Sequence, residues 1–260
     1  GFVVLESYIS DDLIDSTISS FLDICNYSLK NQISKEFSNL DNALIKIREN
    51  NEDYFKKFIS SFSRLYEVEL LCTNPKIIDF IREYFEKSRI MLSGRPIVHM
   101  QGPVTSFKNG YFGLPPHQDF PSTQGSTDGL VIWIPLMNIT SSSYPIMIAP
   151  NSHKNKQIHP YYVNKQSTWV VKNESVPFCN FKEVICRKGD VVVFDVFTVH
   201  KSSTSGDNIN RIAISQRFDN CSDPIFLERG LPTGYKTVVK RKETGALLPD
   251  TNLIPNLFEK

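Results

Sequence analysis

The chain has 260 residues, of which 40% are hydrophobic and 22% are charged, and its formal net charge is +1. A near-neutral chain gives no electrostatic sign of binding to nucleic acid or to an anionic membrane, and no apolar run approaches the roughly 18 residues that span a bilayer. The five cysteines are scattered without a Cys-x-x-Cys pair, which is typical of free thiols in a reducing compartment. We therefore expect a cytoplasmic protein with one domain over residues 1–260, present as a monomer or a homodimer.

The first part of the chain, about residues 1–94, carries helical patterns. Apolar residues at helical spacing follow Ser10, which is a candidate N-cap. A second helical region runs from about Leu40 to Leu71, and we expect it to break at residues 49–52. Asn74-Pro75 predicts a further helix, with an N-cap followed by proline at the first helical position.

From about residue 95 to residue 220, short β-like runs dominate. Many short strands separated by Gly, Pro and Ser turns favour a sandwich or a closed barrel, of which a jelly roll is one form. Composition alone does not choose among these. We expect the tail, about residues 221–260, and the Gly- and Pro-rich segment 110–129 to form lids. The expected strands are Ile97–Gln101, Leu130–Leu136, Ile146–Ala149, Thr168–Val171, Asp190–His200 and Arg211–Phe218.

Three side chains in this β-rich part suggest a metal site. In an extended strand, His117 and Asp119 would point to the same side, and His200 at the end of a β-run would add a second imidazole. Two imidazoles and one carboxylate leave half of an octahedron open, as a non-haem Fe(II) site needs for O2 and a co-substrate. By itself a His-x-Asp tripeptide proves little, because five histidines produce one by chance roughly a quarter of the time.

Arg211 opens the β-run after His200, and two facing strands would bring these residues near each other. The ordinary role of an arginine at the end of a strand is a solvated surface charge. The alternative is an anchor for an acidic co-substrate, because a planar guanidinium donates two parallel hydrogen bonds to a carboxylate.

Together these residues resemble the phytanoyl-CoA dioxygenase family of Fe(II)/2-oxoglutarate-dependent oxygenases. The resemblance covers about residues 95–220. It rests on the His-x-Asp pair and on the distal His200, which follows a Gly-Asp-β-run. It also rests on Ser202, two positions after His200, and on Arg211, eleven positions after His200.

Two further segments, Trp133–Leu136 and Pro145–Lys154, are also similar to that family. Asn151 stands where the family usually has glycine, and Ser142–Pro145 replaces a more usual turn. Neither departure touches a ligand of the expected metal site.

The resemblance implies a mainly β fold with α additions: a double-stranded β-helix (jelly roll, cupin-like) core with N-terminal helices packed on its outer face. It implies a dioxygenase that uses Fe(II), 2-oxoglutarate and O2 to hydroxylate a small molecule, with release of succinate and CO2. Related halogenases replace the carboxylate ligand with a small residue, so the presence of Asp119 argues against halogenation. The residues expected in the site are His117, Asp119 and His200 at the metal; Arg211, Ser202, Gln101 and Trp133 at the co-substrate; and Phe107, Tyr111 and Phe120 at the substrate.

Two other classes of function remain open. The chain would also fit a non-oxidative, metal-dependent cupin-type isomerase, although Arg211 and Ser202 have no purpose there without a dicarboxylate co-substrate. It would also fit a catalytically silent jelly-roll binding protein, which the intact set of metal ligands disfavours. The substrate itself, whether an acyl-CoA, an amino acid, a sugar or a secondary metabolite, is not encoded in these motifs, because variable loops build such pockets.

Overall fold

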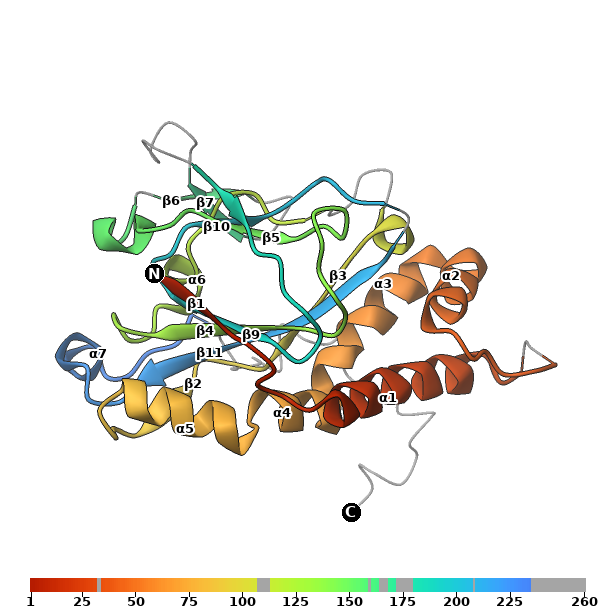
Figure 1. Cartoon of the computed structure of the whole chain (residues 1–260), viewed down its shortest axis with the longest axis horizontal. Helices are drawn as coiled ribbons and strands as arrows, with labels where there is room; N and C mark the ends of the chain where they lie inside the picture. Colours follow the sequence, from red (N-terminus) through yellow and green to blue (C-terminus); the bar gives the residue numbers. More distant parts are fainter. Residues whose placement is uncertain are drawn as a thin grey trace, which may run out of the picture.

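Figure 1 shows the computed structural model of the chain, with a layer of helices against one side of a β-sandwich. The structure describes residues 1–31, 34–106, 113–158, 160–163, 168–171, 180–207 and 209–234. No helix in these ranges is both long enough and apolar enough to cross a bilayer.

The helical part follows the expected boundaries, with two differences. The break near residue 50 is confirmed, because Asn51 ends one helix and caps the next by accepting a hydrogen bond from Tyr54 N. Asn74 also caps its helix as predicted. Ser10 occupies the N-cap position but makes no capping bond, and a short 3-10 turn adds a second break. The elements are α1 (Asp11–Leu29), α2 (Leu40–Asn50), α3 (Glu52–Ser61), η1 (Phe62–Arg64), α4 (Tyr66–Cys72) and α5 (Pro75–Tyr84).

A six-stranded sheet separates these helices from the rest of the molecule. Its order is β1-β9-β4-β11-β2, and β3 also pairs with β11. Strand β11 is long enough to pair with β3 through its first half and with β2 through its second half, while β4 lies on its other side. The strands are β1 (Phe2–Leu5), β2 (Ile90–Leu92), β3 (Ile97–Gln101), β4 (Leu130–Pro135), β9 (Val191–Asp195) and β11 (Arg211–Asn220). The sequence patterns missed β1 and β2.

A smaller sheet of order β10-β5-β8 faces the large one, and a β6-β7 hairpin lies beside it (Figure 1). The predicted single strand Asp190–His200 is wrong, because β9 ends at Asp195 in the large sheet and β10 begins at His200 in the small one. The remaining elements are β5 (Ile146–Ile148), β6 (Pro160–Val163), β7 (Thr168–Val171), β8 (Lys182–Glu183), β10 (His200–Ser202), η2 (Pro103–Thr105), α6 (Phe120–Thr123), η3 (Ser152–Asn155) and α7 (Pro224–Glu228).

The two largest apolar cores hold these layers together. One lies between the helices and the large sheet and includes Phe21, Phe62 and Phe218. The other lies between the two sheets and includes Trp133 and Phe194. Burial of these large side chains away from water is the main force that holds the helical layer and the two sheets against one another. The predicted β-sandwich of jelly-roll type with helices on one outer face is confirmed.

Candidate metal centre

His117, Asp119 and His200 come together between the two sheets. One ligand atom from each residue lies within 4.8 Å of the others. All three side chains are buried, with exposed fractions of 4 to 5%. The imidazole rings of the two histidines lie 4.1 Å apart, and Asp119 Oδ1 lies 3.9 Å from His117 Nε2. These three residues are therefore close enough to bind one metal ion.

The backbone brings the ligands together, although not as the sequence predicted. His117 and Asp119 do not lie in one extended strand, because Asp119 has helical dihedral angles (φ −77°, ψ −32°) and precedes α6. His117 N donates to His200 O (2.9 Å), and His200 N donates to His117 O (3.0 Å). Asp119 N donates to Val196 O (3.0 Å) in the crossover between β9 and β10. Backbone hydrogen bonds thus connect all three ligands to the same crossover.

Both imidazoles are oriented by carbonyl groups on their own loops. His117 Nδ1 lies 2.8 Å from Pro115 O, and His200 Nδ1 lies 3.0 Å from Thr198 O. Because a carbonyl oxygen only accepts, each Nδ1 carries the proton and each Nε2 keeps its lone pair. His117 Nε2 is fully buried and has no hydrogen-bond partner among the residues that the structure describes. A buried lone pair without a partner is costly, and a metal ion is a partner that fits this position.

The charge states of the three ligands also suit a metal ion. Burial lowers the pKa of His117 and brings the pKa of His200 to about 3, with the neighbouring His117 adding to the second shift. Burial alone would raise the pKa of Asp119, but the Arg217 guanidinium and the two imidazoles outweigh burial and hold that pKa well below its usual range. The site therefore consists of two neutral imidazoles and one carboxylate, which are the protonation states that bind metal.

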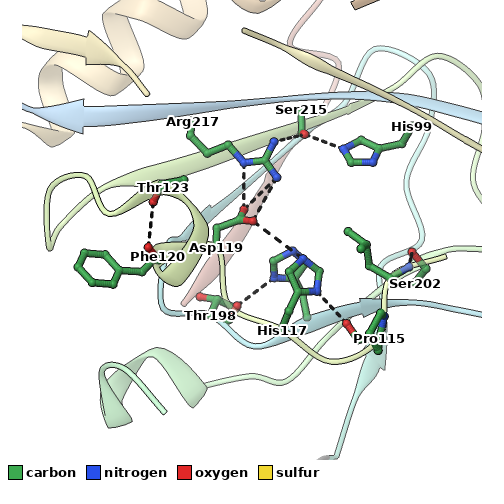
Figure 2. A network of polar contacts seen from close by, with 12 residues as sticks. His99, Pro115, His117, Asp119, Phe120, Thr123, Thr198, Ser202, Ser215 and Arg217 are labelled. Atoms are coloured by element: carbon green, nitrogen blue, oxygen red, sulfur yellow. Dashed lines mark hydrogen bonds and ion pairs between the residues drawn. The ribbon is translucent and has the colours of Figure 1, made fainter. Parts of the chain in front are cut away.

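Arg217 contacts the carboxylate of Asp119 from the side opposite the imidazoles, as Figure 2 shows. Its Nε donates to Asp119 Oδ2 and its Nη2 donates to Oδ1, each at 3.2 Å. The sequence analysis missed this residue. Its signal was present, because Arg217 is six positions after Arg211 on one strand, and an even spacing places both on the same face.

A pocket opens beside the candidate metal position, and His117 and His200 form part of its wall. Arg211, Trp133 and Ser202 line it, as do His99 and Ser215. Arg211 and His200 lie on facing strands, as expected from the sequence. Arg211 belongs to β11 in the large sheet and His200 to β10 in the small sheet, and both line this pocket.

Three of the four residues predicted at the co-substrate, Arg211, Trp133 and Ser202, line this pocket, and the fourth, Gln101, contacts Arg211. Arg211 is 3% exposed, its Nη2 donates to Gln101 Oε1 (3.0 Å), and its guanidinium lies 5.6 Å from the centre of the Trp133 ring. Gln101 Nε2 in turn donates to Ser203 O (2.6 Å), which fixes the amide. Ser202 Oγ accepts a hydrogen bond from Leu114 N (3.1 Å).

The residues predicted at the substrate are placed less favourably. Phe120 packs on Phe197, with ring centres 4.6 Å apart, and Figure 2 shows its ring pointing away from His117. Phe120 is not among the described residues that line the pocket. Phe107 and Tyr111 lie outside the described residues.

Known structures share this fold at low sequence identity. The epimerase SnoN, in complex with Fe3+, alpha-ketoglutarate and nogalamycin RO, is 14% identical over 85% of this chain and 80% of that chain, with a TM-score of 0.56. The carbocyclase SnoK from nogalamycin biosynthesis is 15% identical over 92% and 90% of the two chains, with a TM-score of 0.55. EctD from S. alaskensis with 2-oxoglutarate and 5-hydroxyectoine is 13% identical over 86% and 73%, with a TM-score of 0.54.

At these identities the likeness establishes the fold alone, and no curated protein matches the sequence at a significant level. The sequence model of the phytanoyl-CoA dioxygenase (PhyH) family, however, matches residues 1–212. That range extends beyond the β-rich part into the helical layer, and it includes the three candidate ligands and Arg211. The chain therefore belongs to the phytanoyl-CoA dioxygenase family.

Proposed function

We propose that the protein is an Fe(II)- and 2-oxoglutarate-dependent dioxygenase that hydroxylates a small molecule. The observation that carries this proposal is the convergence of two neutral imidazoles and one carboxylate beside a pocket whose wall carries a buried arginine. Membership of the phytanoyl-CoA dioxygenase family supports the same assignment. Bound iron would supply the oxidising chemistry, in which O2 converts 2-oxoglutarate to succinate and CO2 and leaves its second oxygen atom in a C–H bond of the substrate.

His117, Asp119 and His200 are the residues that would hold the iron. Imidazole nitrogen and carboxylate oxygen are donors that suit iron, and no cysteine lines the pocket among the described residues. The carbonyl partners of the two Nδ1 atoms keep each Nε2 turned to the metal position. These contacts fix the tautomers before any metal binds.

Arg211 is the residue that we assign to the distal carboxylate of 2-oxoglutarate. The amide of Gln101 and the ring of Trp133 orient its guanidinium within the pocket. A planar guanidinium presents two parallel donors to a carboxylate, and each charge-assisted bond is strong in a buried site. Ser202 Oγ already accepts from Leu114 N, so its own hydrogen is directed elsewhere, and we assign the same carboxylate as its acceptor.

Apolar side chains on the remaining walls limit the access of water. Val131 and Phe194 come from the large sheet, and Ile146 comes from the small sheet. A low-polarity wall strengthens the contacts of the co-substrate with Arg211. It also protects a reactive centre from solvent.

The proposal includes hydroxylation as the outcome, and the mass of the product tests this part. A hydroxylated substrate gains one oxygen atom, an epimerised substrate keeps its mass, and a cyclised or desaturated one loses two hydrogens. The comparison matters because solved structures of this fold include an epimerase and a carbocyclase. Mass spectrometry of metabolite mixtures incubated with the loaded enzyme would separate these outcomes and identify the substrate.

Succinate release tests the reaction class without knowledge of the substrate. Protein reconstituted with Fe(II) under anaerobic conditions, then given 2-oxoglutarate and O2, should release succinate slowly. Asp119→Ala should release none, because one of three metal ligands is lost. Arg82→Gln is the control, since Arg82 lies away from the site and forms an exposed ion pair with Asp79 on α5. Absence of succinate from the wild type, or full release from Asp119→Ala, would overturn the proposed function.

A further inference from the structure

Asp119 is in contact with a second group besides the metal position. Arg217 donates to both carboxylate oxygens, through Nε to Oδ2 and through Nη2 to Oδ1. Both side chains are about 95% buried, with exposed fractions of 6% and 5%. The contact is therefore a desolvated fork between a guanidinium and a carboxylate, which fixes direction as well as charge.

Arg217 is itself held in place on its other side. Its Nη1 donates to Ser215 Oγ (2.6 Å), and that oxygen lies 2.7 Å from His99 Nε2. Because arginine can only donate, Ser215 accepts from Arg217, while the tautomer of His99 sets which atom donates between Ser215 and His99. Burial lowers the pKa of His99 well below its usual range, so this ring is neutral. Figure 2 shows this chain running from His99 through Ser215 and Arg217 to Asp119.

The fork limits how the carboxylate can bind a metal ion. Each carboxylate oxygen has two lone-pair directions, and Arg217 occupies one on each oxygen. Asp119 Oδ1 is the oxygen 3.9 Å from His117 Nε2. Because the guanidinium fixes the carboxylate plane, only one of the two oxygens has a free lone pair that points toward the two imidazoles.

We propose that Arg217 is a positioning residue that keeps Asp119 a one-oxygen ligand and so preserves the coordination position that a keto acid needs. A non-haem iron site with two imidazoles and one carboxylate has three open positions only if the carboxylate binds through one oxygen. If both oxygens bind, one position is lost, and a keto acid that chelates through two oxygens then competes with O2 for space. The inference rests on the proposed function and adds a residue that sets how many coordination positions of the metal stay open.

The test separates the metal from the keto acid. Arg217→Gln removes the charge and the fork, Arg217→Lys keeps the charge without the fork, and Ser215→Ala loosens the guanidinium but leaves both partners of the ion pair. Each protein is titrated anaerobically, first with Fe(II) alone. The loaded protein is then titrated with 2-oxoglutarate and with 2-oxobutanoate, which has the same keto acid end but lacks the distal carboxylate. Calorimetry gives the affinities, and the visible charge-transfer absorption of the iron–keto acid chelate reports coordination.

The expected result is a selective loss at the keto acid. Both Arg217 variants should bind Fe(II) within a few-fold of wild type, since Asp119 gains an oxygen for the metal as it loses its partner. They should bind both keto acids more weakly, by about 10-fold to 100-fold, which is the range over which the loss of a group that orients a metal ligand lowers metal affinity or activity. Ser215→Ala should show the same pattern with a smaller loss.

Arg211→Ala serves as the comparison variant. It should lose affinity for 2-oxoglutarate but bind 2-oxobutanoate as the wild type does, because Arg211 is assigned to the carboxylate that 2-oxobutanoate lacks. Equal weakening for both keto acids is thus the signature of Arg217, and weakening for one alone is the signature of Arg211.

Two results would overturn the inference. One is an Arg217 variant that keeps wild-type affinity for both keto acids. The other is a parallel loss of Fe(II) affinity in Arg217→Lys and Ser215→Ala, which would mean that the fork only supports metal binding. A wild-type protein that binds neither Fe(II) nor 2-oxoglutarate would instead overturn the proposed function, so the two failures are distinguishable.

Discussion

Strand β11 has two faces that meet very different surroundings. One face presents Ile212 and Ile214 to the core beneath the helical layer. The other presents Arg211, Ser215 and Arg217 to the pocket between the sheets. All ten residues of the strand are buried, so burial alone does not distinguish the faces. The outer face stabilises the fold by burying apolar area, whereas the inner face uses hydrogen bonds to orient the polar side chains of the pocket. Changes on the two faces should therefore affect different measurements.

The largest effect is expected at a metal ligand on the pocket side. His200→Ala removes one of the two imidazoles and should abolish succinate release, because the remaining two ligands hold iron weakly. The unfolding temperature of the metal-free protein should change little by comparison, which differential scanning calorimetry would measure. A large loss of stability in the metal-free variant would mean that the pocket face also holds the fold together.

The next effect is expected on the outer face. Ile214→Ala leaves a cavity in the core beneath the helices and should lower the free energy of unfolding by about 2–4 kcal/mol. Ile214→Val is the matched control and should cost about 0.5–1.5 kcal/mol. Chemical denaturation measures both. The affinity of the folded Ile214→Ala protein for Fe(II) and 2-oxoglutarate should stay at the wild-type value, and a loss of affinity would show that the two faces are coupled.

A somewhat smaller effect is expected at Arg211. Arg211→Ala removes charge-assisted hydrogen bonds to the co-substrate and should raise the 2-oxoglutarate concentration needed for half-maximal succinate release by about 100-fold. Arg211→Lys should recover only part of this loss, since an ammonium cannot form the two parallel bonds. Iron binding should be unchanged in both variants. Loss of iron in parallel would contradict the assignment of Arg211 to the co-substrate.

The smallest effect is expected from pH. An isolated histidine would be protonated across the range near its ordinary pKa, and protons would then compete with the metal. Burial brings the pKa of His200 to about 3 and lowers that of His117, so the neutral, metal-binding form persists as the pH falls. The Fe(II) affinity should therefore stay flat between about pH 8 and about pH 6. A steady decline over this range in calorimetric titrations would contradict the pKa directions.

The sequence predicted the residues of the site better than the path of the backbone that brings them together. His200, Ser202 and Arg211 lie around one pocket as expected, because the resemblance to the family identified them. The continuous strand from Asp190 to His200 was wrong for a local reason. Asp195 Oδ1 accepts from Phe197 N (2.7 Å), and this side-chain turn redirects an apolar run whose periodicity shows no break.

The meeting of His117 and Asp119 was expected from alternation along a strand, but a turn produces it. Gln118 between them is buried, and its Nε2 donates to Phe197 O (2.6 Å) while its Oε1 accepts from Ile158 N (2.9 Å). These contacts join segments that are distant in the sequence. No local pattern predicts such contacts, since they depend on the final packing of the crossover.

The backbone bonds between the crossover and the three ligand-bearing residues also bear on how the protein acquires and loses iron. Because His117, Asp119 and His200 are connected through main-chain groups, the ligands keep their spacing when no metal is bound. The free energy of metal binding is then not needed to fold the chain, unlike the case of small domains that fold only around their metal. Iron that leaves after oxidation can be replaced without refolding. Loss of the metal therefore does not require loss of the fold.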